Sequence, residues 1–354
     1  MEADSTSATP KRYALVTGCT PGGIGHSLAL TLAAPPYNYH IFATVRDPSK
    51  PELSTLSSRP NITVLPLDVT SHASITALVE RVSTLTSSRL DLLINNAGRN
   101  YTVPGIEVSM AEVRSVFETN VFSVIKITNA FAPLLLNAAS SPPSSSPSKT
   151  GFYSSSGSYL SLDPSTATPR VFRPVLSALN TTLRILTLGL LSPIPVPPAR
   201  PTIINIGSLA ATLPYVFGSV YNASKAALHS YGDTLRVELE PLGVDVVTII
   251  TGGVKSNIGR TERHLKRDSR YAAAEKEYAH RQKYAAEVGM RNEEYAMRVA
   301  KRVLRGGERG FLWEGAMVGL ARAGTWAPQW AVGWWMGGKF GLRKVGKGAA
   351  GKRD

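Results

Sequence analysis

Short apolar runs alternate with amphipathic stretches along the first 136 residues. The strand-like runs, rich in β-branched residues and bounded by Gly, Pro, Asn and Asp, are 14–17, 41–45, 63–67 and 90–95. Helical patterns lie between and after them, at 26–34, 71–83 and 111–136. The alternation resumes with a run at 203–207, a helical pattern over 221–239 and a run at 244–250. Such alternation predicts βαβ units, and therefore an α/β fold with a doubly wound parallel sheet covered on both faces.

A segment of different composition interrupts this pattern. Ser and Pro make up 24 of the 64 residues from 137 to 200, a composition that buries too little apolar surface to repay ordering. We predict mostly loop here, with one surface helix in the more apolar stretch 171–191. Three interpretations stay open: a tolerated surface insertion, a functional lid, and a translated non-coding stretch.

The remaining boundaries follow from composition. We expect a disordered N-terminus (1–12), one Rossmann-type domain (13–258), a helical region on the substrate side (259–310) and a Trp-rich basic tail (311–354). With 354 residues, 43% of them hydrophobic, the chain can bury one large core. The polar, acidic start at 1–10 predicts no secretory signal. One cysteine excludes an internal disulfide, and the six histidines lack metal-ligand spacing, so we predict no metal site.

The positive charge is concentrated toward the end of the chain. From residue 260 onward there are 21 Lys/Arg against 10 Asp/Glu, and all five tryptophans lie between 313 and 335. Indole rings favour bilayer interfaces, so these features favour a membrane surface over nucleic acid. The region 311–340 contains Glu314 and Arg322 and has no uninterrupted apolar run of about 18 residues. We therefore expect it to lie in the interface, or over a substrate entrance, without crossing a bilayer.

A glycine-rich loop follows the first predicted strand. Its sequence, Thr17-Gly-Cys-Thr-Pro-Gly-Gly-Ile-Gly25, leads directly into a predicted helix. Glycines let the backbone approach a pyrophosphate, and the helix N-terminus supplies amide donors and a favourable dipole. The second strand ends in Val45-Arg46 without a carboxylate. Arginine there pairs with a 2′-phosphate, which favours NADPH over NADH, unless Arg46 is merely exposed and Asp47 makes the selection.

The segment Tyr221-Asn-Ala-Ser-Lys225 is the strongest catalytic candidate. Residues four apart share one face of a helix, so Lys225 is expected near the Tyr221 hydroxyl. A neighbouring ammonium favours the phenolate and lowers a pKa that is ordinarily about 10. Thirteen residues upstream, Ser208 follows a predicted strand, where its hydroxyl can hold a substrate oxygen while charge develops.

Taken together, these motifs resemble the short-chain dehydrogenase/reductase family over residues 13 to about 258. The resemblance rests on the glycine loop, Asn95-Asn96-Ala97-Gly98, Ser208 and Tyr221/Lys225. Further segments, including Gly207–Ala210, Ile250–Val254 and 339–342, are similar to the fungal NADPH-dependent 1-acyl-dihydroxyacetone-phosphate reductase branch. The sequence departs from the family in its long insertion, a glycine loop one residue longer than usual, and Thr251 where proline is common.

The resemblance implies roles for further residues. Catalysis would use Ser208, Tyr221 and Lys225, with Asn120 holding a water that relays protons through Lys225. Cofactor contacts would come from Gly18, Gly23, Ile24, Gly25, Arg46, Asp68, Val69, Asn96, Ala97, Gly98, Tyr221, Lys225, Val254 and Ser256. Lys126 is a further candidate on the cofactor side, although an exposed lysine is the simpler interpretation.

The resemblance also implies an activity and a setting. We expect NADPH-dependent reduction of a ketone, with 1-acyl-dihydroxyacetone phosphate giving 1-acyl-glycerol 3-phosphate. The implied setting is the cytoplasmic face of the endoplasmic reticulum or lipid droplets, otherwise the cytoplasm, with pairing as a homodimer or homotetramer. Two alternatives stay open: a reductase of a steroid, polyketide or other apolar ketone, and a non-catalytic NADP(H)-sensing membrane protein.

Overall fold

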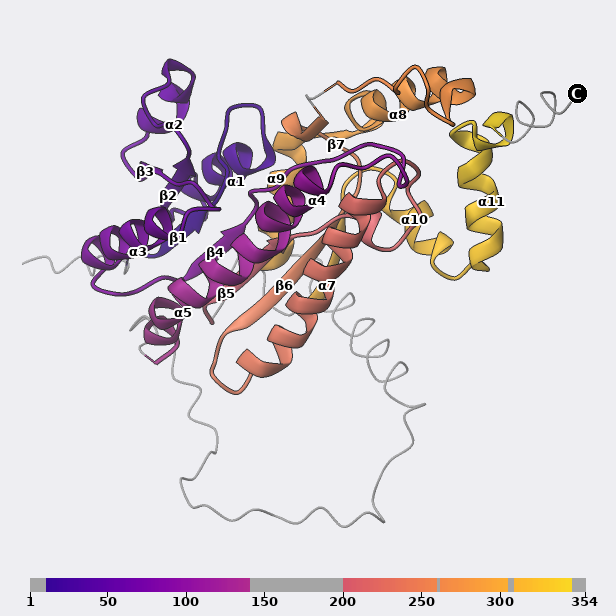
Figure 1. Cartoon of the computed structure of the whole chain (residues 1–354). Coiled ribbons are helices and arrows are strands. Elements are labelled where there is room, and N and C mark those ends of the chain that lie inside the picture. The colour runs from indigo at the N-terminus through magenta and orange to yellow at the C-terminus, as the bar shows by residue number, and fades with distance from the viewer. Residues whose placement is uncertain (1–10, 141–199, 260–261, 305–308, 346–354) are drawn as a thin grey trace, which may run out of the picture.

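A seven-stranded parallel sheet forms the centre of the computed structural model (Figure 1), which describes residues 11–140, 200–259, 262–304 and 309–345. The strand order is β3-β2-β1-β4-β5-β6-β9. The bounds are β1 Tyr13–Val16, β2 His40–Val45, β3 Ile62–Pro66, β4 Leu92–Asn95, β5 Thr202–Ile206, β6 Asp245–Thr251 and β9 Gly310–Glu314. The order runs outward in both directions from β1, so the doubly wound α/β prediction is confirmed.

Helices cover both faces of the sheet. One face carries α1 (Ile24–Ala33) and α9 (Asn292–Leu304), which pack against each other. The other carries α3 (His72–Thr86), α5 (Ser123–Ser140) and α7 (Ser219–Leu239). Shorter or peripheral elements are α2 (Ser54–Ser57), α4 (Met110–Phe117), β7 (Val254–Lys255), α8 (Glu275–Val288), β8 (Met290–Arg291), α10 (Val318–Gly324) and α11 (Gln329–Lys339).

Two apolar clusters hold these layers together. Leu28 of α1 and Val299 of α9 belong to the first cluster, and both side chains are almost fully buried. Ile75 of α3 and Phe131 of α5 belong to the second. Burial of a large aliphatic or aromatic side chain contributes about 1.5–3 kcal/mol, so the two layers fix the sheet firmly.

The predicted helix at 111–136 is divided in the structure. It contains α4, a π-helical segment at Glu118–Phe122, and α5, which continues to Ser140. The predicted insertion therefore begins a few residues too early, because residues 137–140 belong to α5; residues 141–199 lie outside the described part. The run Met110–Ser140 is long and apolar enough to cross a bilayer, but half of its most apolar window is buried within the protein.

The sheet does not end at residue 258. Strand β9 pairs in parallel with β6, with Thr248 opposite Phe311 and Thr251 opposite Glu314. Helix α9, which lies in the region predicted to be helical on the substrate side, buries Tyr295 completely against the core. The predicted boundary at 258 is therefore wrong for the described chain: residues beyond it complete the sheet and one helical layer.

The Trp-rich tail also packs on the body of the protein. Phe340 and Met336 near the end of α11 are buried with Tyr278 of α8 and Phe217 of the loop before α7. Figure 1 shows α10 and α11 (yellow) at the end of the molecule beside α8. The part of the tail that the structure describes is thus joined to the loops at the carboxyl edge of the sheet by an aromatic cluster.

Candidate active site

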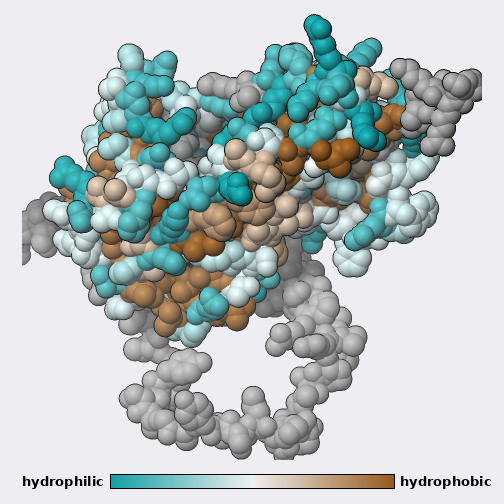
Figure 2. Space-filling model, viewed as in Figure 1, coloured by the Kyte–Doolittle hydropathy of each residue, from teal (hydrophilic) through white to brown (hydrophobic). Residues whose placement is uncertain are grey.

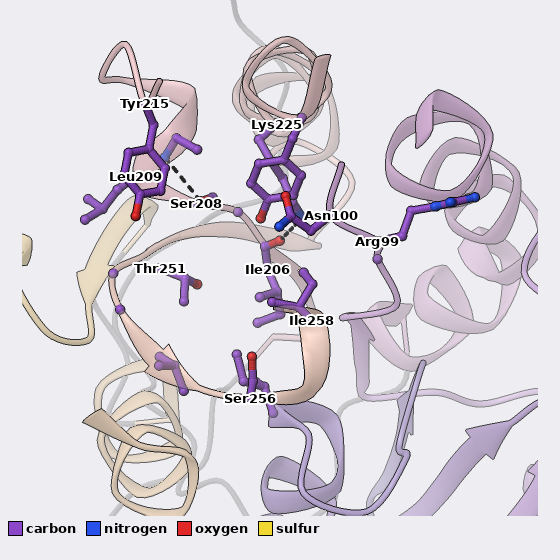
Figure 3. A pocket seen from close by; sticks show the side chains of 18 of the residues that line it. Arg99, Asn100, Ile206, Ser208, Leu209, Tyr215, Lys225, Thr251, Ser256 and Ile258 are labelled. Atoms are coloured by element: carbon purple, nitrogen blue, oxygen red, sulfur yellow. Dashed lines mark hydrogen bonds between the residues drawn. The ribbon is translucent and has the colours of Figure 1, made fainter. Parts of the chain in front are cut away.

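A cavity of about 1240 Å³ opens at the carboxyl edge of the sheet. Loops at the ends of β1 to β6 line it, as parallel sheets with a switch in strand order ordinarily do. In Figure 3, Ser208, Leu209 and Tyr215 lie along one side, Lys225 and Asn100 lie beside them, Ile258 lies near Ile206 in the middle, and Ser256 lies at the other end. Predicted site residues that line it are Gly18, Gly23, Ile24, Arg46, Asp68, Val69, Asn96, Ala97, Gly98, Ser208, Tyr221, Lys225, Val254 and Ser256.

The glycine loop forms one wall of this cavity. Gly18 adopts a φ of +73°, and a Cβ there would lie 3.0 Å from the Ala97 Cα. Gly25 does not line the cavity but is packed behind it, since a Cβ would lie 2.4 Å from the Asn96 Nδ2. Asn96 in turn donates hydrogen bonds from Nδ2 to the carbonyls of Thr17 and Gly18. The Asn-Asn-Ala-Gly segment therefore holds the loop in shape.

The N-terminus of α1 faces the same space. Gly23 is the N-cap residue and supplies no side-chain cap, and the first turn of α1 contains no acidic residue. Gly23 and Ile24 both line the cavity. Uncapped amides and the helix dipole favour an anion at this point. The glycine loop, which presents backbone with few side chains, and the uncapped N-terminus of α1 therefore fit the pyrophosphate of a dinucleotide.

The tips of β2 and β3 form the far end of the cavity. Arg46 is exposed, lines the cavity, and lies close enough to Asp68 to help lower the pKa of that carboxyl. The larger cause is hydrogen bonding, because Thr70 donates to Asp68 Oδ1 from both its hydroxyl (2.7 Å) and its N–H (2.9 Å). Asp68 is therefore fixed as an acceptor, and Arg46 is available to an anionic group.

Ser208 begins a short 3-10 turn directly after β5. Its hydroxyl accepts a hydrogen bond from the Ala210 N–H (3.2 Å), and its own N–H donates to His229 Nε2 (3.1 Å). Burial, with a smaller contribution from the charge of Lys225, lowers the pKa of His229 to about 4. His229 is therefore neutral near pH 7, which leaves Nε2 able to accept. His229 anchors the backbone that carries Ser208.

Tyr221 and Lys225 lie one turn apart on α7, as the spacing predicted. The Lys225 ammonium is 6.0 Å from the centre of the Tyr221 ring and donates to the Ile206 carbonyl at 2.8 Å (Figure 3). Burial lowers the pKa of Lys225 to about 8. The structure thus shows a lysine held against the end of β5, with its ammonium beside the tyrosine ring.

The pKa of Tyr221 differs from expectation. Burial raises it, opposed by a hydrogen bond with Ser208 and by the positive charge of Arg281. The sequence interpretation assigned the lowering effect to Lys225. In the structure Arg281 of α8 also contributes positive charge that lowers the Tyr221 pKa, and the Lys225 ammonium donates to the Ile206 carbonyl.

Asn120 and Lys126 lie outside the cavity lining. The buried Asn120 amide accepts from the Arg99 N–H (2.9 Å) and donates to the Arg99 carbonyl and to Ser224 Oγ (both 3.0 Å). It therefore holds the loop after β4 against α7, and its role in a proton relay stays a prediction. Lys126 forms an ion pair with Glu118 at 2.5 Å and is 41% exposed, so the structure does not bring it to the cavity.

Sequence reasoning missed two residues at this site. His229 follows Tyr221 and Lys225 at the same four-residue interval, so helical spacing would have placed it on their face. Arg281 carries no comparable signal, because it lies in an Ala-, Glu- and Arg-rich stretch with the composition of a solvated helix. Only the packing of α8 over the cavity reveals it.

Comparison with known proteins agrees with this geometry. The profile of the family described as short chain dehydrogenase matches residues 12–142 and 178–267. A relative from Hypocrea virens, named short-chain dehydrogenase virD, is 30% identical over 88% of this chain and 86% of its own length. An NADPH-dependent 1-acyldihydroxyacetone phosphate reductase from Schizosaccharomyces pombe is 29% identical over 70% of this chain and 62% of its own length.

Among solved structures, a short-chain dehydrogenase from Streptomyces avermitilis superposes with a TM-score of 0.63. It is 18% identical and covers 98% of this chain and 100% of the other. At that identity the likeness supports the fold alone.

Proposed function

Because this chain belongs to the short-chain dehydrogenase family, we propose that it is an NADPH-dependent reductase that converts 1-acyl-dihydroxyacetone phosphate to 1-acyl-glycerol 3-phosphate. The observation that carries the proposal is the convergence of Ser208, Tyr221 and Lys225 on one cavity beside an uncapped helix N-terminus. The named activity of the Schizosaccharomyces pombe relative supports the choice of substrate.

The residues present fit the proposed cofactor. The glycine loop and the first turn of α1 would hold the pyrophosphate, Arg46 the 2′-phosphate, and Asp68 with Val69 the adenine. Asn96–Gly98, Val254 and Ser256 would contact the rest of the molecule. When bound, the reduced nicotinamide supplies the hydride.

The chain's own residues would manage the substrate oxygen and its proton. Ser208 would donate a hydrogen bond to the ketone oxygen, and Tyr221 would give that oxygen the proton that completes the alcohol. The raised pKa of Tyr221 keeps the phenol protonated at neutral pH, which suits reduction. Lys225 would bind the nicotinamide ribose from its position against the Ile206 carbonyl.

An assay of purified protein tests the proposed reaction. NADPH oxidation is measured with 1-acyl-dihydroxyacetone phosphate and with a panel of steroid and polyketide ketones at matched concentrations. Preferential turnover of the acylated phosphate is expected. If the apolar ketones are reduced and the phosphate is not, the substrate assignment is wrong and the broader reductase assignment stands. If nothing is reduced while NADPH binds, the sensor alternative replaces both.

Arg46 is expected to determine cofactor preference. The variant R46A should raise KM for NADPH about 10- to 100-fold, the loss expected for one charge-assisted contact to a phosphate, and leave KM for NADH within a factor of about 2. Steady-state kinetics with both cofactors measures this. R59A, which removes an exposed arginine outside the cavity, is the control. Equal losses with both cofactors would assign selection to another residue.

We also propose that the α10–α11 end of the molecule binds an anionic lipid surface. Trp326, Trp330 and Trp334 are 88%, 77% and 65% exposed there. The Arg343 guanidinium lies 4.0 Å from the centre of the Trp334 ring, and neither Arg343 nor Arg322 of α10 forms an ion pair with any described residue. Figure 2 shows hydrophobic residues reaching the surface near α10, below the hydrophilic side chains of α8. Exposed indoles beside unpaired cations match the interface of an anionic bilayer.

Vesicle sedimentation tests this surface. The double variant W326A/W330A is expected to bind phosphatidylserine–phosphatidylcholine vesicles at least about 10-fold more weakly, because it removes two large apolar contacts. The control V237A/L242A removes exposed apolar side chains from α7 and the turn after it. Unchanged binding of the tryptophan variant, or equal loss in the control, would remove the proposal.

A further inference from the structure

Arg281 is an unusual residue for the wall of a cavity. Only 5% of it is exposed, although it is a charged side chain on α8. Its Nε donates to the Val216 carbonyl at 3.2 Å, and its guanidinium lies 3.5 Å from the centre of the Tyr215 ring. No carboxylate among the described residues pairs with it.

A buried arginine without a counter-ion is costly. Charged side chains are almost never fully buried unless they are paired, because removal from water is not repaid. Burial accordingly lowers the pKa of Arg281. The stacked Tyr215 ring and one backbone carbonyl satisfy only part of the guanidinium. Its remaining donors therefore suit an anion that enters the cavity.

Arg281 lies on the α8–α11 side of the cavity, away from the tips of β2 and β3 where the nucleotide would bind. Among the described residues that line the cavity, the only carboxylate is Asp68, just after β3. Near α11, Lys339 also lines the cavity; its ammonium donates to the Tyr284 hydroxyl at 2.7 Å and lies 4.1 Å from the centre of that ring. Lys339 forms no ion pair with a described residue either. Two cations thus share the α8–α11 side of the cavity.

Apolar side chains complete the same wall. Val332, Trp335, Met336 and Phe340 of the α11 region line the cavity together with Leu320 of α10. A ligand at this end therefore meets positive charge beside Tyr215 and a hydrocarbon surface along α10 and α11. That combination matches an anionic group joined to an acyl chain.

We infer that Arg281, with Lys339 as a second cation, binds the phosphate of the acylated ketone substrate; this inference rests on the proposed function. Arg281 would thereby determine the preference of the enzyme for phosphorylated over unphosphorylated ketones. The position agrees with the chemistry of the substrate. The phosphate ester is attached to the carbon next to the ketone carbon, so its binding group must lie close to Tyr221. Arg281 and Tyr221 line the same cavity, and the charge of Arg281 helps to lower the pKa of the Tyr221 phenol.

The test compares two ketones that differ only in the phosphate: 1-acyl-dihydroxyacetone phosphate and 1-acyl-dihydroxyacetone. The variant R281Q is expected to lower kcat/KM for the phosphorylated ketone about 10- to 100-fold, mainly through KM, the range for one charge-assisted contact. The unphosphorylated ketone should lose less than a factor of about 3, and that loss should appear in kcat, because for this ketone R281Q changes only the charge near the Tyr221 phenol. K283Q removes an exposed charge two residues along α8, where Lys283 pairs with Glu262, and should leave both ketones unchanged.

Two further measurements make the outcome decisive. K339Q is expected to show a smaller loss confined to the phosphorylated ketone, and it replaces R281Q should that variant fail to fold. Calorimetry with 1-acyl-glycerol 3-phosphate in the presence of NADP+ measures the affinity for the same phosphate group without requiring turnover. If the wild-type protein reduces neither ketone, the proposed function fails. Weaker binding of 1-acyl-glycerol 3-phosphate to R281Q than to the wild type and K283Q would still support the anion site in that case. Equal losses with both ketones, or unchanged binding of the probe, overturn the inference.

Discussion

The Tyr221→Phe variant should lose ketone reduction by about 10²- to 10⁴-fold in kcat, the range that removal of a positioned proton donor ordinarily produces. The phenol is half-buried, lines the cavity and interacts with Ser208, so its hydroxyl lies where a substrate oxygen would be protonated. Loss of one oxygen leaves the ring in place, and NADPH affinity is expected to stay within a factor of about 3. Single-turnover NADPH oxidation and fluorescence titration measure the two quantities.

The control is a second tyrosine on the same helix. Tyr231 does not line the cavity, and Y231F removes a hydroxyl that interacts with Thr128. It should reduce ketones at the wild-type rate. If Y221F retains more than a tenth of wild-type kcat, Tyr221 is not the proton donor. If it loses NADPH binding in parallel, the role of the residue is structural.

The sheet was predictable because its signals are local. Each buried strand is a short β-branched run, and each crossover helix carries an apolar face at helical spacing, as Ile75, Leu78 and Val82 do in α3. The glycine loop was predictable for a similar reason, since only glycine tolerates the φ of +73° at Gly18 so close to Ala97. These constraints act within a few residues and are visible in the sequence.

The substrate side was not predictable, because it depends on long-range packing. Strand β9 is five residues long and is identified only by its pairing with β6. From its sequence context Arg281 is expected to be exposed to solvent. Its burial depends on the packing of α8 over the cavity, and on the tail, where Phe340 packs in one cluster with Tyr278 of α8. The effect of Arg281 on the Tyr221 pKa was missed for the same reason, because Arg281 lies on a different helix, 60 residues further along the chain.

A large structural effect is expected from Gly207→Ala, directly after β5. A Cβ at this position would lie 2.2 Å from His229 Nε2 and 2.8 Å from the Ile249 carbonyl. Real Cβ atoms do not approach so closely, so His229 must move away and release the Ser208 N–H that it holds. Overpacking of this kind costs about 1–3 kcal/mol of unfolding free energy, and a shift of about 1 Å in a substrate-positioning group costs about 10²-fold in rate.

Denaturant unfolding and steady-state kinetics together measure both effects, and a double variant identifies their cause. H229A alone should lower activity, because Ser208 loses its anchor, but should destabilise the protein less than G207A. In G207A/H229A the contact with the ring is gone and only the one with the Ile249 carbonyl remains, so the double variant should be more stable than the sum of the two single losses predicts. Purely additive losses would show that the imidazole is not what resists the new methyl group. Ser208 would then be held by β5 itself, and the hydrogen bond from its N–H to His229 would contribute little to the geometry of the site.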